Sequence, residues 1–489
     1  MAPARCAAPR GGARDAPGLC GGGARAYGRR ERPAGAALVF RRGGARERFA
    51  GFAPRAELDT HDPDASVAKL SFLRKRSKIV EIVGAKDLLF GLTLSGVCAV
   101  FDRATRRRLC FVNTSPDEVV RSLFYNEANE SLISVSVFRA DNFSSLKCRT
   151  TPLDCIRARE PARGVSLFEN ECLKWPGFVE FDDVNGKVIT HCAADKVYKL
   201  WTMANYDLLY SVLEPQLHEL KVAPNVLFLV FTRTTTELPL KVLCIEDGRP
   251  LLELTQPLLP DVPVELVEFF GSKLLVKQAG EPLRITDVRT GEQRAIAADA
   301  LGAPSGFIYL FEMERFLTFG HGQVHAWDFD GRLVTHFEDH TLWHADCSTN
   351  NIFISSGQQL LISHCRSPTD ESGRSPTDEN GRSPTDDGGP SSGGGGGSGA
   401  SSVPPPAAPC APAAAPAVAP AAAVAGGAGG GRGARHGCIN VSSIGTGGNL
   451  ARIAARGELQ DVTALWYNED AGELYVGNTH GTIQLWASA

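Results

Sequence analysis

Four short runs of β-branched and aromatic residues recur in the same order along this chain from Lys78 onward. In the first unit the runs are Ile79–Val83, Leu88–Leu92, Val97–Phe101 and Leu109–Val112, with turn residues between them. Evenly spaced short strands predict a sandwich, a barrel or a propeller. A repeat of four strands in about 35 residues favours the propeller, because each blade of a propeller is one four-stranded sheet.

We count eight such units, with seven as the alternative. Their first runs begin at Ile79, Val119, Phe178, Leu217, Val264, Phe307, Asn351 and Val462. The last unit stops after three strands at Trp486, and we predict that Ala68–Leu73 supplies the fourth, which would close the ring and remove its free edges. The predicted fold is all-β, a single β-propeller of seven or eight four-stranded blades with eight favoured, closed by an N-terminal strand that joins the C-terminal blade.

An aromatic residue followed by Asp at the end of the third strand is the blade signature of WD-repeat propellers. The residues at these positions are Phe101, Asp102, Trp201, Asp287, Trp327, Asp328 and Trp486. Only Trp327-Asp328 has both parts of the signature in full. We expect the aromatic ring to pack between adjacent sheets and the carboxylate to accept hydrogen bonds from the turn that follows.

Composition divides the chain into four parts. We predict a disordered Arg/Ala/Gly-rich head at 1–65, blades at 66–365, a disordered low-complexity insertion at 366–436 and the last blades at 437–489. The insertion interrupts one blade between its second and third strands, and it costs the fold little because loop-closure entropy grows slowly with length. For the head, a transit peptide for an organelle and a basic nuclear or RNA-binding arm are the alternatives to a disordered extension.

The insertion opens with three near-identical octads, each beginning Arg-Ser-Pro-Thr-Asp. Ser367, Ser375 and Ser383 each precede a proline, which suggests proline-directed phosphorylation that would add about two negative charges at each serine. The alternative is a repeat that arose by replication slippage and has no role.

Charge and cysteine content restrict the classes of partner. The net charge of −4 provides no overall field that would attract nucleic acid. The thirteen Cys include no CxxC pair, which favours free thiols packed in a core within a reducing compartment. No apolar run has the length of a membrane span. We expect a cytoplasmic and/or nuclear protein, monomeric within a larger complex, that binds other proteins and needs no cofactor.

Histidines provide the candidates for chemistry. His340, His344 and Cys347 could bind zinc, but structural zinc sites usually combine two separate knuckles, so an inter-blade loop is favoured. For catalysis the clustered histidines are His321, His325 and His344, and no nucleophile–base pair accompanies them. We therefore predict that the chain is not an enzyme, with a propeller hydrolase or lyase as the alternative.

Two basic segments and one tryptophan could serve binding. Arg74–Lys78 and Arg106–Arg108 predict solvated turns, with an acidic peptide, nucleic acid or a phosphoinositide as alternative ligands. Trp175 lies just before the run at Phe178. Packing of Trp175 between blades is favoured over an exposed anchor, because aromatic residues supply much of a core's buried area.

Four segments resemble a plant and green-algal family of WD-repeat-like, transducin-type propeller proteins. They are Leu70–Phe101 (LSFLRKRSKIVEIVGAKDLLFGLTLSGVCAVF), Asn113–Asn126 (NTSPDEVVRSLFYN), Lys174–Val188 (KWPGFVEFDDVNGKV) and Phe337–Ile352 (FEDHTLWHADCSTNNI). The resemblance spans about 70–365 and 437–489, which is nearly the whole core, and does not cover the head or the insertion. It implies a propeller fold and no catalytic residues.

Propellers bind partners through variable loops held on a rigid frame, so the expected function is that of a protein-interaction scaffold or adaptor. A sharper alternative is a substrate receptor of a cullin-RING ubiquitin ligase, a class that often carries Trp-Asp-x-Arg at the end of a third strand. The segment Leu283–Arg289 resembles that motif at Asp287 and Arg289, with Thr286 in place of the tryptophan.

Overall fold

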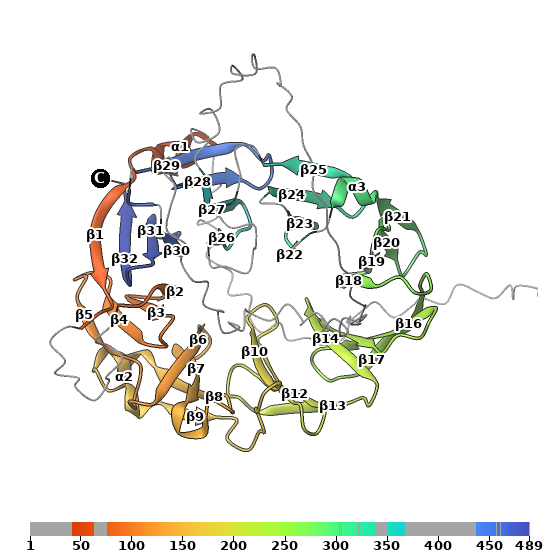
Figure 1. Cartoon of the computed structure of the whole chain (residues 1–489), viewed down its shortest axis with the longest axis horizontal. Helices are drawn as coiled ribbons and strands as arrows, with labels where there is room; N and C mark the ends of the chain where they lie inside the picture. The colour runs from red at the N-terminus through yellow and green to blue at the C-terminus, as the bar shows by residue number, and fades with distance from the viewer. Residues whose placement is uncertain are drawn as a thin grey trace, which may run out of the picture.

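The computed structural model describes residues 42–62, 76–302, 304, 306–320, 323–337, 342, 351–366, 437–455, 457–459 and 461–488. They form eight four-stranded sheets arranged in a ring (Figure 1). Every pair of neighbouring strands within a sheet is antiparallel, and consecutive sheets follow the order of the chain. The prediction of a β-propeller with eight blades is confirmed.

The strands of each blade run from the inside of the ring to the outside. Blades 1 to 4 are β2–β5 (Ile79–Ala85, Leu88–Thr93, Cys98–Asp102, Arg108–Phe111), β6–β9 (Glu118–Asn126, Ser131–Phe138, Lys147–Pro152, Val165–Leu167), β10–β13 (Phe178–Asp182, Lys187–Cys192, Val197–Thr202, Leu208–Leu213) and β14–β17 (Leu217–Ala223, Val226–Phe231, Glu237–Cys244, Pro250–Pro257). Blades 5 to 8 are β18–β21 (Val264–Phe270, Lys273–Gln278, Leu283–Asp287, Gln293–Ile296), β22–β25 (Gly306–Leu310, Arg315–Gly320, Gln323–Asp328, Leu333–His336), β26–β29 (Ile352–Ile354, Leu360–Arg366, Gly437–Ser443, Asn449–Ala454) and β30–β32 with β1 (Val462–Asn468, Glu473–Asn478, Thr482–Ala487, Ala53–Asp59).

Helical structure within the described residues is limited to short segments. They are α1 (Arg42–Ala50), α2 (Leu153–Arg157), α3 (Ala298–Leu301) and two 3-10 turns at Arg139–Asp141 and Pro161–Arg163. None of these helices has the length and apolar character that a membrane span requires.

The core lies between blades as well as within them. In β3 every residue is buried, because a second strand has a sheet neighbour on each edge and a blade on each face. Phe101 of blade 1 shares one apolar cluster with Tyr475 and Leu485 of blade 8. The apolar runs in the sequence therefore report contacts between adjacent sheets, which is where a propeller buries its hydrophobic surface.

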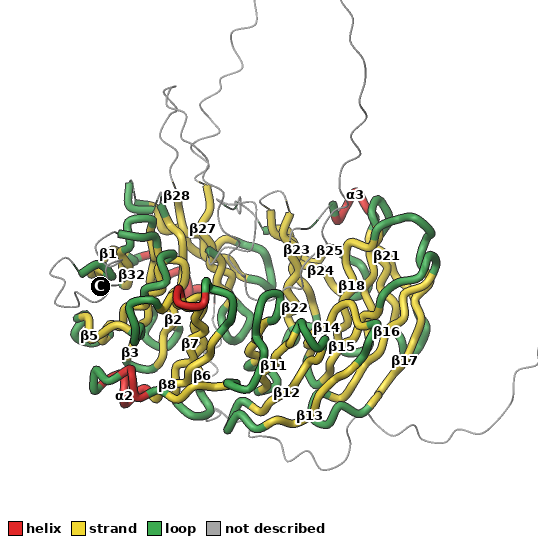
Figure 2. Tube along the Cα trace, turned by 60° about the horizontal axis from the view of Figure 1, so that its bottom comes forward, coloured by secondary structure: helices red, strands yellow, loops and turns green. Residues whose placement is uncertain are grey.

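The loops alternate between two faces of the ring because neighbouring strands are antiparallel. Loops that join second to third strands share a face with the loops between blades, and Ser145 and Lys174 form a β-bridge between one loop of each kind. We call this the insertion face, because residues 367–436 connect β27 to β28 there. Figure 2 shows α3, which lies between blades 5 and 6, at the top and α2, on the opposite face, at the bottom.

An N-terminal strand closes the ring, but it is not the predicted segment. β1 pairs with β32 from Ala53 opposite Ala487 to Asp59 opposite Thr482, and the two strands lie side by side in Figure 1. Ala68–Leu73 lies outside the described residues, and the fourth strand of this sheet is β1. The head prediction for 1–65 therefore included a blade strand. An outermost strand needs backbone pairing more than apolar side chains, so its composition resembled that of a loop.

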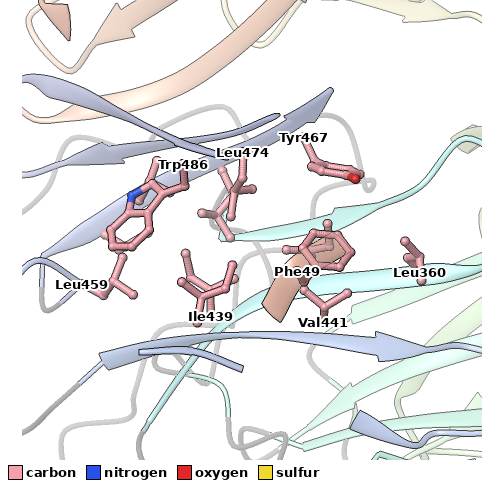
Figure 3. Close-up of a cluster of buried hydrophobic side chains, with 13 residues drawn as sticks. Phe49, Leu360, Ile439, Val441, Leu459, Tyr467, Leu474 and Trp486 are labelled. Atoms are coloured by element: carbon pink, nitrogen blue, oxygen red, sulfur yellow. The ribbon is translucent and has the colours of Figure 1, made fainter. Parts of the chain in front are cut away.

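The segment before β1 also packs against the propeller. Phe49 of α1 is buried in a cluster that joins blades 7 and 8, with its ring centroid 5.4 Å from that of Tyr467 (Figure 3). Ile439 and Val441 of blade 7 and Trp486 of blade 8 belong to the same cluster. Residues 42–62 thus contribute both a strand and a buried aromatic ring to the closure.

Arginines from both predicted basic segments contact the end of β1. Arg76 forms an ion pair with Asp59 (2.6 Å), and Arg108 forms one with Asp62 (2.9 Å). Arg108 also donates to the carbonyl oxygen of His61 at 2.9 Å. These two cations are used within the molecule, so they contribute to the closure and not to a free basic surface.

Candidate protein-binding face

The most exposed large apolar side chain among the described residues is Trp175, which is 80% exposed. The prediction that Trp175 packs between blades is wrong. Trp175 lies in a tight turn on the insertion face, where the N–H of Gly177 donates to the carbonyl oxygen of Lys174 at 2.6 Å. A Cβ at Gly177 would lie 2.7 Å from the carbonyl oxygens of Lys174 and His191, so the turn requires glycine at this position.

The backbone of this turn is fixed on both sides. Leu173 is buried and its carbonyl oxygen accepts from the N–H of Leu146 at 3.0 Å. The N–H of Trp175 itself donates to the carbonyl oxygen of Ser144 at 3.3 Å. An exposed aromatic ring on a fixed backbone loses little conformational entropy when a partner binds, which favours affinity.

A second exposed aromatic residue, Phe143, lies in the loop next to the Trp175 turn. It belongs to the loop that pairs with the Trp175 turn, and its side chain is 45% exposed. Phe143 has φ of +59°, and the preceding Asn142 has φ of +55°. A bulky residue in the left-handed region costs about 1–3 kcal/mol and persists only where the surrounding structure imposes it. We call Phe143, Trp175 and the exposed Pro176 the aromatic platform.

A cationic side chain adjoins the aromatic platform. Lys174, which precedes Trp175 in the chain, is exposed. Apolar rings with cations at their margin are the composition of a protein-binding hot spot, in which Trp and Tyr or Phe supply buried area and the charged rim sets orientation.

The blade-signature residues serve the frame and not the platform. Trp327 donates from Nε1 to Thr318 Oγ1, and Trp201 donates to Thr190 Oγ1, both at 2.9 Å. Trp486 is buried with no partner for Nε1 within the described residues, since Val476 occupies the position that corresponds to those threonines. Sequence reasoning missed this threonine on the second strand.

The acidic members of the signature accept hydrogen bonds from their turns. Asp102 Oδ1 accepts from the N–H of Thr105 at 2.6 Å, and Asp328 Oδ1 accepts from that of Arg332 at 2.8 Å. Phe101, at the end of the third strand before Asp102, is buried between blades. These contacts position the loops of the opposite face.

The two candidate adaptor residues differ in availability. Asp287 accepts from Lys273 Nζ at 2.8 Å and from the N–H of Arg289 at 2.9 Å. The Lys273 hydrogen bond holds the pKa of Asp287 well below its usual range. The Arg289 side chain is exposed on the opposite face. Asp287 is therefore occupied within its own blade, which leaves Arg289 as the group that a partner could reach.

Several candidate residues lie outside the described residues. They are His321, His340, His344, Cys347, Ser367, Ser375 and Ser383. Zinc binding and phosphorylation at these positions stay predictions. His325 is described, on the third strand of blade 6, with its ring centroid 5.2 Å from that of His336, and burial lowers its pKa. The part of the chain that the structure describes holds no group of three His, Cys, Asp or Glu side chains placed to bind a metal.

The innermost strands carry buried carboxyl groups. Burial raises the pKa of Glu81 on β2 to about 7, although the N–H of Leu123 on β6 donates to Glu81 Oε2 at 3.2 Å. Burial, with the carboxylate of Asp182 as a smaller cause, also raises the pKa of Glu180 on β10 to about 7. Because these pKa values lie near neutral pH, the two groups make the stability of the fold depend on pH.

Comparison with known proteins gives a family. The family model described as "Domain of unknown function (DUF7899)" matches residues 38–381. The chain belongs to this family. The DUF7899 match begins ahead of α1 and β1, so it includes the closing segment as well as most of the blades. The resemblance to a plant and green-algal family stays a prediction.

Solved structures give similarity in fold only. A computationally designed protein, Ika8, is 16% identical, with 84% of this chain and 96% of that chain covered and a TM-score of 0.47. The C-terminal WD40 domain of Sif2 is 12% identical, with 85% and 97% covered and a TM-score of 0.45. No curated protein matches the chain. Because both scores are below 0.5, the fold assignment rests on the sheet topology of this chain.

Proposed function

We propose that the protein is a non-catalytic interaction scaffold that binds a partner protein through the aromatic platform on the insertion face. The observation that carries this proposal is the display of Trp175, 80% exposed, on a turn whose backbone is fixed by hydrogen bonds. A tryptophan in water contributes nothing to the stability of the fold, but it can contribute 2 kcal/mol or more when a partner covers it.

The platform favours a partner with an apolar segment that fits over two separate rings. Phe143 and Trp175 lie in loops that are paired through Ser145 and Lys174. An apolar segment of a partner can therefore extend over both loops. Lys174 at the margin adds attraction for an acidic group beside that apolar segment.

The test is affinity purification of the full chain from native cells, with quantitative mass spectrometry of the proteins that co-purify. We compare the unmodified chain with Trp175→Ala, Phe143→Ala and a control, Phe311→Ala. Phe311 is also an exposed aromatic residue, but it lies on the opposite face, in the turn between β22 and β23. We expect a set of partners to fall by about 30-fold or more with Trp175→Ala, as loss of about 2 kcal/mol requires, and to stay with Phe311→Ala.

Recovery of the same partners in the same amounts with all three variants would refute the platform as the binding site. A chain without residues 367–436, purified in parallel, separates binding by the platform from binding by the insertion. Thermal unfolding of each variant shows that the fold is intact, because exposed side chains are replaced.

A ligase receptor is the second candidate, and it depends on Arg289. That side chain is exposed while Asp287 holds the turn that presents it. We expect Arg289→Ala to abolish capture of a ligase adaptor if this function is correct. Absence of any adaptor among the proteins that co-purify with the unmodified chain would end this proposal.

A further inference from the structure

Each blade of this propeller ends in an outer strand, and one edge of that strand has no neighbour in its sheet among the residues that the structure describes. Such an edge presents backbone donors and acceptors that can pair with another strand. Soluble proteins protect these edges with charged residues, prolines or very short strands. The outer strands of this chain can be compared on that basis.

Seven of the eight outer strands are protected in one of these ways. β9 has only three residues and β25 only four, and the other five contain charged or proline side chains: Arg108 in β5, Glu253 with two prolines in β17, Arg294 in β21, Arg452 in β29, and Pro54 with three charged residues in β1. β13, with the sequence Leu-Leu-Tyr-Ser-Val-Leu, has no charged residue and no proline over six residues. It shares with β5, β25 and β29 a β-bulge against the third strand, which in β13 falls at Leu209, so the bulge does not distinguish it from them.

β13 lies at the perimeter of the ring (Figure 1), and most of its apolar side chains are exposed. Leu213 is 68% exposed, and Leu208 and Leu209 are exposed as well. This is a larger apolar exposure than on any other outer strand that the structure describes. An edge that is both apolar and unprotected indicates a binding surface or an aggregation hazard.

Contacts with blade 4 and with the neighbouring strand β12 fix the position of β13. Val212 is buried in the cluster between blades 3 and 4, and Tyr210 Oη donates to the carbonyl oxygen of Ile245 at 2.9 Å. β13 also pairs with β12 through five residue pairs, from Leu208 opposite Trp201 to Leu213 opposite Val197. The edge is therefore already extended and ordered before it meets a second strand.

We propose that β13 pairs with β13 of a second copy of this chain, antiparallel and centred on Ser211, to form a symmetric dimer. In this register Leu209 lies opposite Leu213 of the second copy, and the reverse pair repeats the contact. Ser211 lies opposite its own equivalent on the two-fold axis. Cross-strand apolar pairs and backbone hydrogen bonds then stabilise the dimer at both ends.

Charge favours a second copy as the occupant of this edge. Self-pairing places equal charges opposite each other wherever a strand carries one at its centre, and β13 carries none. The flanking acids do not oppose each other either, because Leu208 lies opposite Glu214 in this register. Glu214 is also neutralised by Lys241 at 3.1 Å. This dimer departs from the monomer expected from the sequence.

The experiment measures the mass of the purified full chain in solution by sedimentation equilibrium, from about 1 to 100 μM, a range that covers micromolar dissociation constants. We expect a concentration-dependent dimer. Ser211→Lys places two like charges on the axis and should weaken the dimer at least about tenfold, and Ser211→Asp should do the same. An equimolar mixture of the two variants should restore a dimer that contains one copy of each.

The matched control is Leu333→Lys on β25, another exposed leucine on an outer strand, which should leave the dimer unchanged. A chain that stays monomeric over the whole range would overturn the proposal, and would leave strand addition by a different protein as the use of this edge. A dimer that survives Ser211→Lys at full strength, or a mixture that fails to associate, would overturn it too. Restoration in the mixture also shows that both variants are folded.

Discussion

The junction between blades 8 and 1 and the junction between blades 4 and 5 hold the ring together by different physical means. At the first, Gly84 of β2 lies so close to Trp466 of β30 that a Cβ would overlap the indole ring. A Cβ at Gly477 would similarly meet Ile79. Apolar surfaces are in direct contact along the innermost strands, and β1 seals the outside.

At the second junction a charged group links the innermost strands. Lys221 of β14 contacts Glu268 of β18 at 2.6 Å and Glu219 of its own strand at 3.4 Å. All three side chains are about 17% exposed. Burial alone would lower the pKa of Lys221, but the carboxylates of Glu268 and Glu219 outweigh it and raise that pKa.

The difference shows what each junction has to achieve. Blades 4 and 5 are joined by continuous chain, so a polar link between them suffices. β1 continues along the chain into blade 1, but β30–β32 come from the other end of the described chain, so β32 and β1 must find each other during folding to complete blade 8. Extensive apolar contact and a shared sheet provide stability at that seam without relying on chain connection.

The largest expected effect comes from removing the closing segment. A chain that lacks residues 1–62 loses β1, with buried Leu58, and α1, with buried Phe49. Burial of these two side chains alone contributes about 3–6 kcal/mol, so we expect a loss of at least that size in the free energy of unfolding. Denaturant unfolding of this chain and of a control that lacks only residues 1–41 measures the difference. Equal stability of the two truncated chains would contradict closure by β1.

Removing the cation at the other junction should have the next largest effect. Lys221→Met leaves Glu219 and Glu268 close together without a counter-charge, and loss of one partner from a buried pair costs about 3–5 kcal/mol. The measurement is the free energy of unfolding at pH 7. The additional change Glu268→Leu should recover part of the loss. If the double variant is no more stable than Lys221→Met, the ion pair is not what joins blades 4 and 5.

The blades could be predicted from the sequence, but the features that distinguish the two junctions could not. The four-strand repeat predicted the blades because inner strands are buried on both faces and therefore show continuous apolar runs, as in Leu88–Thr93. The closing strand escaped prediction because Ala53–Asp59 is partly exposed and polar, and only its backbone pairing defines it. Ionic links between blades, such as Lys221 with Glu268, depend on which strands face each other and cannot be found from spacing.

At the candidate site, too, the sequence did not predict the exposure of the two aromatic residues. Trp175 was expected in the core because tryptophan usually is, although Lys-Trp-Pro-Gly is a turn sequence and a turn at a loop tip has no core beside it. Turn signals therefore predict exposure better than side-chain type does. Phe143 gave no signal, since its left-handed backbone follows from a loop conformation that the residue type disfavours.

The junction between blades 1 and 2 is of a third kind, because it contains a carboxyl group, that of Glu81, whose protonation changes with pH. The pKa of Glu81 rises from 4.5 to about 7 in the folded state, so the folded chain binds a proton more tightly than the unfolded chain. The folded state consequently loses stability as pH rises from 4.5 through 7, up to about 3 kcal/mol. Glu81→Gln keeps an acceptor for the N–H of Leu123 and should raise stability at pH 8 by up to that amount, with little change at pH 4.

Thermal unfolding of Glu81→Gln across this pH range tests the titration, with the exposed Glu57→Gln as control. A gain that is the same at pH 4 and pH 8 would show that Glu81 does not titrate as described.

One added methyl group tests the close contact between Gly84 and Trp466 at the seam, the junction between blades 8 and 1. Gly84→Ala forces the Trp466 ring to move, and overpacking of this kind costs about 1–3 kcal/mol. Gly357→Ala is the control, because a Cβ at that position meets only Gln359 at 3.9 Å. Chemical denaturation measures both. Replacement of Trp466 by Leu in the Gly84→Ala chain should relieve the overlap, and no relief would mean that the two residues are not in contact.

The smallest effect is expected from removing an exposed ion pair at the junction between blades 8 and 1. Its size tests directly whether that junction depends on charge. Arg76 and Asp59 at the seam approach to 2.6 Å, the same distance as Lys221 and Glu268, but these side chains are 47% and 41% exposed. Water and salt screen an exposed pair, so Arg76→Ala should cost only about 0.2–1 kcal/mol and almost nothing at high salt. Unfolding of Arg76→Ala and Lys221→Met at low and high ionic strength compares the two. If Arg76→Ala costs as much as Lys221→Met, the seam is held by charge and not by apolar contact, and the contrast between the two junctions is lost.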